Sequence, residues 1–128
     1  MKIAFTTSTG KIIDQHFGQC QSFQIWEVGP NEADFLETVS IGEHGDDEED
    51  RIAARVKILS DCAVVYTMQI GGPAAAKLIA QKIYPMKTNN EVNLKETVER
   101  FQEVLRNNPP PWLRKAMNKG QLKSFQEE

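Results

Sequence analysis

The chain has 128 residues, of which 40% are hydrophobic and 26% are charged, and its formal net charge is -3. These values are typical of one globular domain with a single core. A generic nucleic-acid binder is more often basic, so the composition argues against that class. No apolar run approaches the roughly 20 residues that a membrane span needs, and the N-terminus shows no signal-peptide pattern. We therefore expect a cytoplasmic protein that binds neither nucleic acid nor a membrane.

The first part of the chain predicts three strands. Residues 2–8 are β-branched and aromatic and lead into Gly10, which is typical of a strand that ends in a turn. Residues 11–20 form a turn-rich connection. Residues 22–28 and 34–41 both alternate between apolar and polar side chains, so they predict a β-hairpin.

Helices and strands then alternate. A polar loop with Asp46 or Asp47 as a helix cap precedes apolar residues at helical spacing, which predicts a helix through Leu59. The continuous apolar run at 62–68 predicts a central strand that is buried on both faces. The sequence further predicts a helix from Gly71 to about Lys82, a short strand at 83–88, and a helix at 93–107.

The order β–β–β–α–β–α–β–α predicts an α/β fold in which three antiparallel strands precede parallel strands joined by helices. We expect one domain at residues 1–107. Residues 108–128 begin with three prolines, which predict a semi-rigid linker and a short tail. Trp112, Leu113 and Met117 suit a short amphipathic helix. The tail's basic residues would suit an acidic partner, or the tail is a partly ordered extension.

The stretch Asp14-Gln15-His16-Phe17-Gly18-Gln19-Cys20 is the strongest candidate for a site. Imidazole and thiolate are ligands that iron and iron–sulfur species accept, and Asp14 could orient the His16 ring through a hydrogen bond. Cys20 lies in a polar turn, so we expect an accessible thiol. The alternative is an exposed turn that binds nothing. Two ligands do not complete a zinc site, and Cys62 reads as a core residue.

Two other segments are weaker candidates. Gly71-Gly72-Pro73 opens a helix, and such a start offers free N–H groups to an anion, although ordinary helix initiation explains it equally well. The acidic loop Glu43–Asp50 with His44 could bind a hard cation or simply lead into a helix. Neither the expected strands nor the turns carry a nuclease carboxylate set or a nucleophile elbow, so we expect no enzymatic activity.

The segments "DQHFG", "FQIWEV" and "EDRIAARVKILSDCAVVYTMQIGGPAAAKLI" together resemble the dinitrogenase iron–molybdenum cofactor biosynthesis family over residues 1 to about 107. The ending "PPPWLRKAM" narrows the resemblance to one branch of the family. The resemblance implies a ribonuclease-H-like fold with a mixed five-stranded sheet and no nuclease activity. It also implies a carrier that binds an iron–sulfur precursor of the nitrogenase cofactor transiently and passes it along an assembly line.

The resemblance implies NifB and the NifEN scaffold as partners, with apo-nitrogenase as a further one, and it places the cluster ligand at His16. Cys20 departs from many family members, so it is either an added thiolate ligand or incidental. If the sheet has the family order, Ser8, His16, Gly71 and Gly72 lie at one edge, where α/β folds bind ligands. Two other functions stay open: a chaperone of an apo-nitrogenase or scaffold subunit, and a small redox enzyme that uses Cys20.

Overall fold

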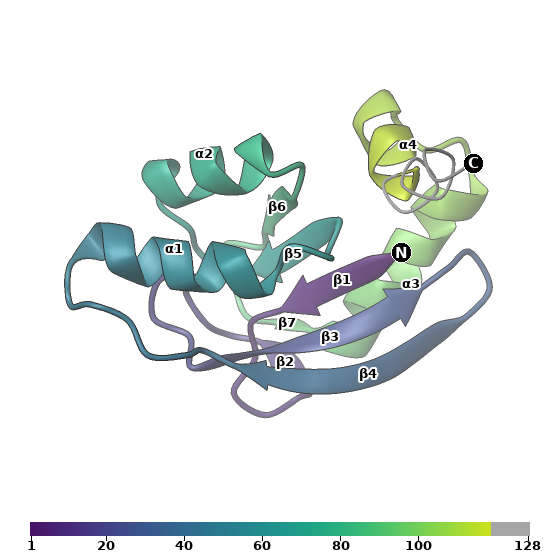
Figure 1. Ribbon diagram of the computed structural model, residues 1–128. Coiled ribbons are helices and arrows are strands. Elements are labelled where there is room, and N and C mark those ends of the chain that lie inside the picture. The colour runs from purple at the N-terminus through teal and green to yellow at the C-terminus, as the bar shows by residue number, and fades with distance from the viewer. Residues whose placement is uncertain (119–128) are drawn as a thin grey trace.

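The computed structural model describes residues 1–118, and a mixed five-stranded sheet lies at its centre (Figure 1). The strands of this sheet are β1 (Lys2–Phe5), β3 (Ser22–Val28), β4 (Ala33–Ser40), β5 (Val64–Thr67) and β6 (Tyr84–Lys87). Their order is β4-β3-β1-β5-β6. The hairpin β3–β4 and the pair β1–β3 are antiparallel, whereas β5 is parallel to both β1 and β6. The predicted α/β architecture and its mixed five-stranded sheet are confirmed.

Two helices cover each face of the sheet (Figure 1). The helices are α1 (Glu48–Ile58), α2 (Gly72–Ala80), α3 (Leu94–Arg106) and α4 (Pro111–Met117). On one face Ala4, Phe23 and Val65 share a buried cluster with residues of α1 and α2. On the other face Ile3, Phe5 and other strand residues share a cluster with α3 and α4. The alternation of side chains along β1 and β5 therefore divides the core into two halves.

The helix starts follow from their capping residues. The Asp47 carboxylate accepts a hydrogen bond from the backbone N–H of Asp50 at 2.8 Å, which makes Asp47 the cap of α1. Asn93 accepts one from Glu96 N–H at 2.9 Å and caps α3. The apolar stripe of α3 is buried, as its spacing predicts. It consists of Leu94, Val98, Phe101 and Leu105.

Two short strands of the structure were not predicted. β2 (Ile12–Ile13) falls within the segment that we expected to be only a turn-rich connection, and it pairs antiparallel with β7 (Val92–Asn93). The backbone N–H of Leu94 also donates to the Lys11 carbonyl at 2.9 Å. This ribbon attaches the loop after β1 to the start of α3.

The expected linker and tail pack in part on the domain. Leu113 is fully buried and Ala116 is 3% exposed, and both belong to the core half under α3. The ring centroids of Trp112 and of Tyr84 in β6 are 5.2 Å apart. Residues 111–117 thus form the predicted short helix, and this helix completes the core instead of standing apart as a spacer. Lys119 and Lys123, part of the expected basic tail, lie outside the described residues.

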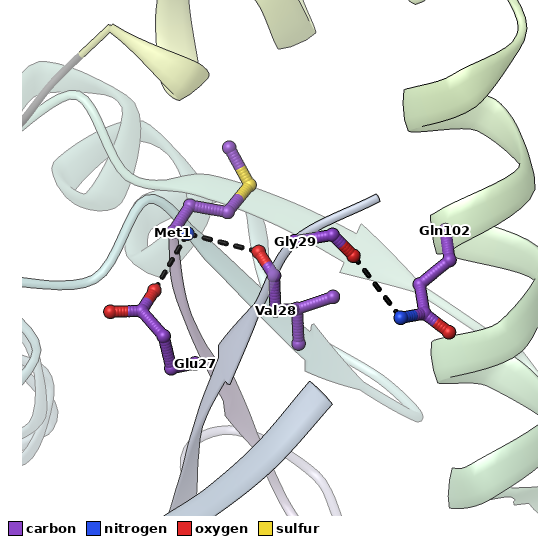
Figure 2. A network of polar contacts seen from close by, with 5 residues as sticks. All are labelled: Met1, Glu27, Val28, Gly29 and Gln102. Atoms are coloured by element: carbon purple, nitrogen blue, oxygen red, sulfur yellow. Dashed lines mark hydrogen bonds and ion pairs between the residues drawn. The ribbon is translucent and has the colours of Figure 1, made fainter. Parts of the chain in front are cut away.

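A set of polar contacts fastens β1, the β3–β4 turn and α3 to one another (Figure 2). The Met1 amine lies 2.6 Å from the Glu27 carboxylate and donates to the Val28 carbonyl at 2.9 Å. On the next residue, the Gly29 carbonyl accepts a hydrogen bond from Gln102 Nε2 at 3.1 Å. These contacts fix the end of the hairpin that lies far from the loop 14–20.

The strand β4 is an exposed edge of the sheet. Its pairing with β3 shifts between Ile25 and Trp26, because Ile25 pairs with Glu37 while Trp26 pairs with Phe35. Leu36 is therefore a bulged residue without a partner of its own, and bulges of this kind interrupt an edge. Phe35 is 50% and Leu36 is 45% exposed. Across residues 1–118, none of the helices has the length and apolar character required to cross a membrane.

Candidate functional site

The backbone of the loop that carries His16 is bonded to the end of β5. The N–H of Met68 donates to the Gln15 carbonyl at 3.0 Å, and the N–H of Phe17 donates to the Gln69 carbonyl at 2.9 Å. His16 and Gln69 thereby form an isolated parallel bridge. The loop is thus a continuation of the sheet beyond the carboxyl ends of β1 and β5, the position where α/β folds bind ligands.

Two buried threonines strengthen this attachment. Thr6 follows β1 and Thr67 ends β5, and neither is exposed to solvent. Each hydroxyl lies 3.0 Å from the Gln15 carbonyl oxygen, and the two hydroxyl oxygens are 3.2 Å apart. Because they sit at the ends of adjacent parallel strands, the pair fixes the residue that precedes His16 to the centre of the sheet.

His16 is exposed at a cavity of about 720 Å³. Among the described residues, no hydrogen-bond partner holds either nitrogen of its ring. Met68, Gln69, Ile70 and Gly71, which follow β5 beside the loop, also line the cavity, as does Ala74 in the first turn of α2. From α1, Glu48, Arg51 and Ile52 complete the lining. The structure therefore brings His16 and Gly71 to one cavity.

Gly71 caps α2 with extended backbone (φ -78°), and Pro73 lies in the first turn of the helix. The first N–H groups of a helix have no acceptor within the helix, so this end of α2 presents donors and a positive dipole end. Gly72 belongs to the same turn but does not line the cavity. A Cβ atom at Gly71 would meet only Pro73 Cδ at 3.9 Å, so the backbone does not require glycine there.

The expectation of an accessible Cys20 thiol is wrong. Cys20 is 1% exposed and belongs to the core half under α1 and α2, together with Phe17 and Phe23. Its N–H donates to the His16 carbonyl at 3.1 Å, and its thiol donates to the Phe17 carbonyl at 3.2 Å. This turn directs the side chain inward. Burial raises the pKa of the Cys20 thiol, although the nearby Arg55 guanidinium opposes that shift.

Ser8 and Asp14 bond to each other, and neither lines the cavity at His16. The Asp14 carboxylate accepts from the backbone N–H of Ser8 at 2.9 Å and, through its second oxygen, from the Ser8 hydroxyl. Both oxygens of Asp14 are thus engaged by Ser8, so Asp14 does not orient His16 as we expected. Ser8 does not line the cavity. Within residues 1–118, no group of three or more His, Cys, Asp and Glu residues is placed to hold a metal ion.

Two arginines of α1, Arg51 and Arg55, were not among the predicted site residues. Arg51 lines the cavity, and Arg55 is only 4% exposed. The Arg55 guanidinium donates from Nη1 to the Arg51 carbonyl at 3.0 Å and from Nη2 to the Cys20 carbonyl at 2.7 Å. It thereby braces the turn that follows His16. The signal was present in the sequence, because Arg55 interrupts the apolar face that Ile52 and Leu59 define.

This geometry defines the class of the protein: an α/β domain with a cavity at the carboxyl edge of its parallel strands. The chain matches the family described as "Dinitrogenase iron-molybdenum cofactor" over residues 1–104. It is 37% identical to Protein NifX of Herbaspirillum seropedicae, in an alignment that covers 100% of this chain and 90% of that protein. The chain therefore belongs to the dinitrogenase iron–molybdenum cofactor family, as its motifs indicate. Some of its relatives carry the name NifX.

The chain has two further similarities, one in sequence and one in fold. The chain is 38% identical to Protein NifY of Azotobacter vinelandii over 91% of this chain and 48% of that protein. The crystal structure of PH0822 superposes with a TM-score of 0.65, covering 80% of this chain and 90% of that one. At 15% identity this second similarity concerns the fold alone. Family membership indicates a role in the biosynthesis of the iron–molybdenum cofactor.

Proposed function

We propose that the protein is a non-catalytic carrier, which binds an iron–sulfur precursor of the iron–molybdenum cofactor at His16 and transfers it between assembly proteins. The observation that supports the proposal is the combination of an exposed side chain and a fixed backbone at His16. Its imidazole is exposed at a cavity, while its backbone is bonded to the central strands. Imidazole is a suitable ligand for iron. A fixed backbone reduces the entropy that binding would otherwise cost.

The geometry favours a releasable cargo. In the cavity lining His16 offers an exposed imidazole, whereas the Met68 thioether is half-buried and the Cys20 thiol is buried behind the turn. A cluster held by one protein ligand would depend on weaker contacts for the rest of its affinity. The N-terminal turn of α2 is positioned to supply such contacts to an anionic cluster. A carrier must hold its cluster at a defined position but with few protein ligands, so that the cluster can be released.

We infer that the carrier's partners belong to the same assembly line, with NifB as the source of the precursor and the NifEN scaffold as its recipient. Membership of the cofactor family supports this inference. We also infer a ribonuclease-H-like fold, and the order β4-β3-β1-β5-β6 with β4, β3 and β1 antiparallel supports it.

A second candidate function is a chaperone that holds an apo-nitrogenase or scaffold subunit. The exposed aromatic and aliphatic side chains of Phe35 and Leu36 on the β4 edge favour it. Substitution of both residues by Ser would then abolish partner binding and leave cluster binding intact. Under the carrier proposal, His16→Ala would instead abolish cluster binding and leave the β4 edge unchanged.

The test is an anaerobic titration of the protein with isolated cofactor precursor, followed by visible absorption and co-elution of iron. His16→Phe keeps a ring of similar size but removes both nitrogens, so we expect it to lose stoichiometric binding. His16→Cys restores a soft ligand at the same position and should recover part of the affinity. Equal binding by the wild type and His16→Phe would refute the assignment of His16. Absence of binding by the wild type would favour the chaperone.

A further inference from the structure

A second hollow lies beside the His16 cavity, and its chemistry is different. Its volume is about 420 Å³, and it is bounded by Gly18 and Gln19 of the loop and by Arg51 and Arg55 of α1. Gly18, Gln19 and Arg51 also line the first cavity, so the two spaces are adjacent. No acidic side chain lines the second hollow within the described part of the chain.

Arg55 is the unusual residue of this hollow. It is 96% buried, since its exposed fraction is 4%, yet it forms no ion pair with a carboxylate of residues 1–118. Two backbone carbonyls accept hydrogen bonds from its terminal nitrogens, and its Nε is buried without an acceptor. A guanidinium has five N–H donors and a charge that is costly to bury without an anion. The carbonyls satisfy part of its hydrogen bonding and leave the charge uncompensated.

The neighbouring groups do not compensate this charge either. The titratable side chains beside Arg55 in this hollow are not carboxylates: burial raises the pKa of the Cys20 thiol, and His44 also lines the hollow. Glu48 lines the neighbouring cavity with Arg51 but forms no ion pair with either arginine. Arg51 adds a second positive charge to the same hollow and has no ion-pair partner among the described residues. Two guanidinium groups one helical turn apart repel each other unless an anion lies between them. Planar guanidinium groups bind carboxylate and phosphate oxygens in pairs.

We propose that Arg51 and Arg55 form a subsite for a small oxyanion, with carboxylate or phosphate oxygens as its ligand chemistry. The anion would bridge the exposed guanidinium of Arg51 and the free donors of Arg55. Such an anion is either a free ion of the solution or an anionic group of the cargo in the neighbouring cavity. Binding would also stiffen the loop 16–20, because Arg55 already donates to the Cys20 carbonyl.

The first arm of the test uses the protein alone with inorganic phosphate as the probe. We expect millimolar phosphate to shift the NMR signal of the Arg55 Nε–H group. Arg51→Gln removes one charged partner and should weaken phosphate binding about tenfold. Arg51 is exposed, so this variant is expected to fold even if substitution of Arg55 is not tolerated. Arg100→Gln removes an equal charge from α3, on the other face of the sheet, and should bind phosphate like the wild type.

The second arm identifies the source of the anion. If the hollow holds an anionic group of the cargo, phosphate will compete with the cofactor precursor and raise the apparent Kd of the precursor. This rise in Kd will be smaller in Arg51→Gln than in the wild type. If the natural ligand is a free ion, precursor and phosphate will bind without competition. No phosphate-induced shift, or equal phosphate affinity in Arg51→Gln and the wild type, would overturn the subsite. Since the first arm contains no cluster, its result does not depend on the carrier proposal.

Discussion

Substitution of Thr67 by Val tests whether the sheet holds the His16 loop in place. Val keeps the β-branched shape of Thr but removes the hydroxyl, so the packing at this fully buried site changes little. The lost group lies 3.0 Å from the Gln15 carbonyl and 3.2 Å from the Thr6 hydroxyl. At about 1 kcal/mol for each hydrogen bond, we expect the free energy of unfolding to fall by about 1–2 kcal/mol.

The loss of stability in Thr67→Val should be largest at the loop that carries His16. The Phe17 N–H, which donates to the Gln69 carbonyl, is a local reporter of the bridge. If the opening of the loop becomes easier by about 1 kcal/mol, hydrogen exchange at Phe17 will accelerate about fivefold. Hydrogen exchange of amides at the centre of β1 should accelerate only as much as the fall in the free energy of unfolding of the whole domain requires. Both quantities can be measured on one sample series, by denaturant titration and by NMR-detected exchange.

A matched control is available in α3. The Thr97 hydroxyl also donates to a backbone carbonyl, that of Asn93 at 2.8 Å, but the bond is exposed to solvent. Thr97→Val should therefore cost less than about 0.5 kcal/mol, because water replaces the lost donor. If Thr67→Val proves no more costly than Thr97→Val, and Phe17 exchange is unchanged, the threonine pair does not anchor the loop and our reasoning fails.

Three further predictions concern the core. Leu113→Ala should lower the free energy of unfolding by about 2–4 kcal/mol in a denaturant titration, because Leu113 is fully buried; a change below about 0.5 kcal/mol would mean that α4 is not part of the core. Burial raises the pKa of Tyr66 to about 12, so the neutral phenol is stabilised in the folded state. The free energy of unfolding of the wild type should therefore fall by about 2 kcal/mol relative to that of Tyr66→Phe as the pH rises from about 10 to 12, and parallel pH profiles of the two proteins would contradict this. The Cys20 thiol should react with iodoacetamide at neutral pH only as fast as the fold opens, since it is buried and its pKa is raised. Labelling at the rate of a free thiol would show that the turn 16–20 does not hold the side chain inside.

Local patterns predicted most of the elements correctly. The hairpin β3–β4, the capped start of α1, the buried strand β5 and the apolar stripe of α3 each depend on neighbours in the sequence. The ribbon β2–β7 could not be predicted in this way. It pairs two dipeptides about eighty residues apart, Ile12-Ile13 with Val92-Asn93, and a dipeptide is too short to show periodicity.

In the candidate site, too, local sequence predicted some features correctly and others wrongly. The imidazole and thiol in one turn predicted His16 as a candidate ligand, the family resemblance implied the same residue, and the structure places it at a cavity together with Gly71. The orientation of Cys20 was predicted wrongly, because the polar neighbours of this residue suggest exposure. Its side chain is instead turned inward by the backbone bonds to His16 and packs beside Phe17 and Phe23. Composition around a residue does not determine which way a tight turn faces.

The parallel pairing of β1 with β5 also has a consequence for folding. The first strand cannot find this neighbour until the chain has reached residue 64, since Ile3 pairs with Val64. The bridge between His16 and Gln69 requires a further stretch of chain. Contacts so distant in sequence form late, after the hairpin β3–β4 has had time to close. A nascent or partly unfolded chain therefore has the histidine but no cavity, and ligand binding will draw the equilibrium toward the fully folded domain.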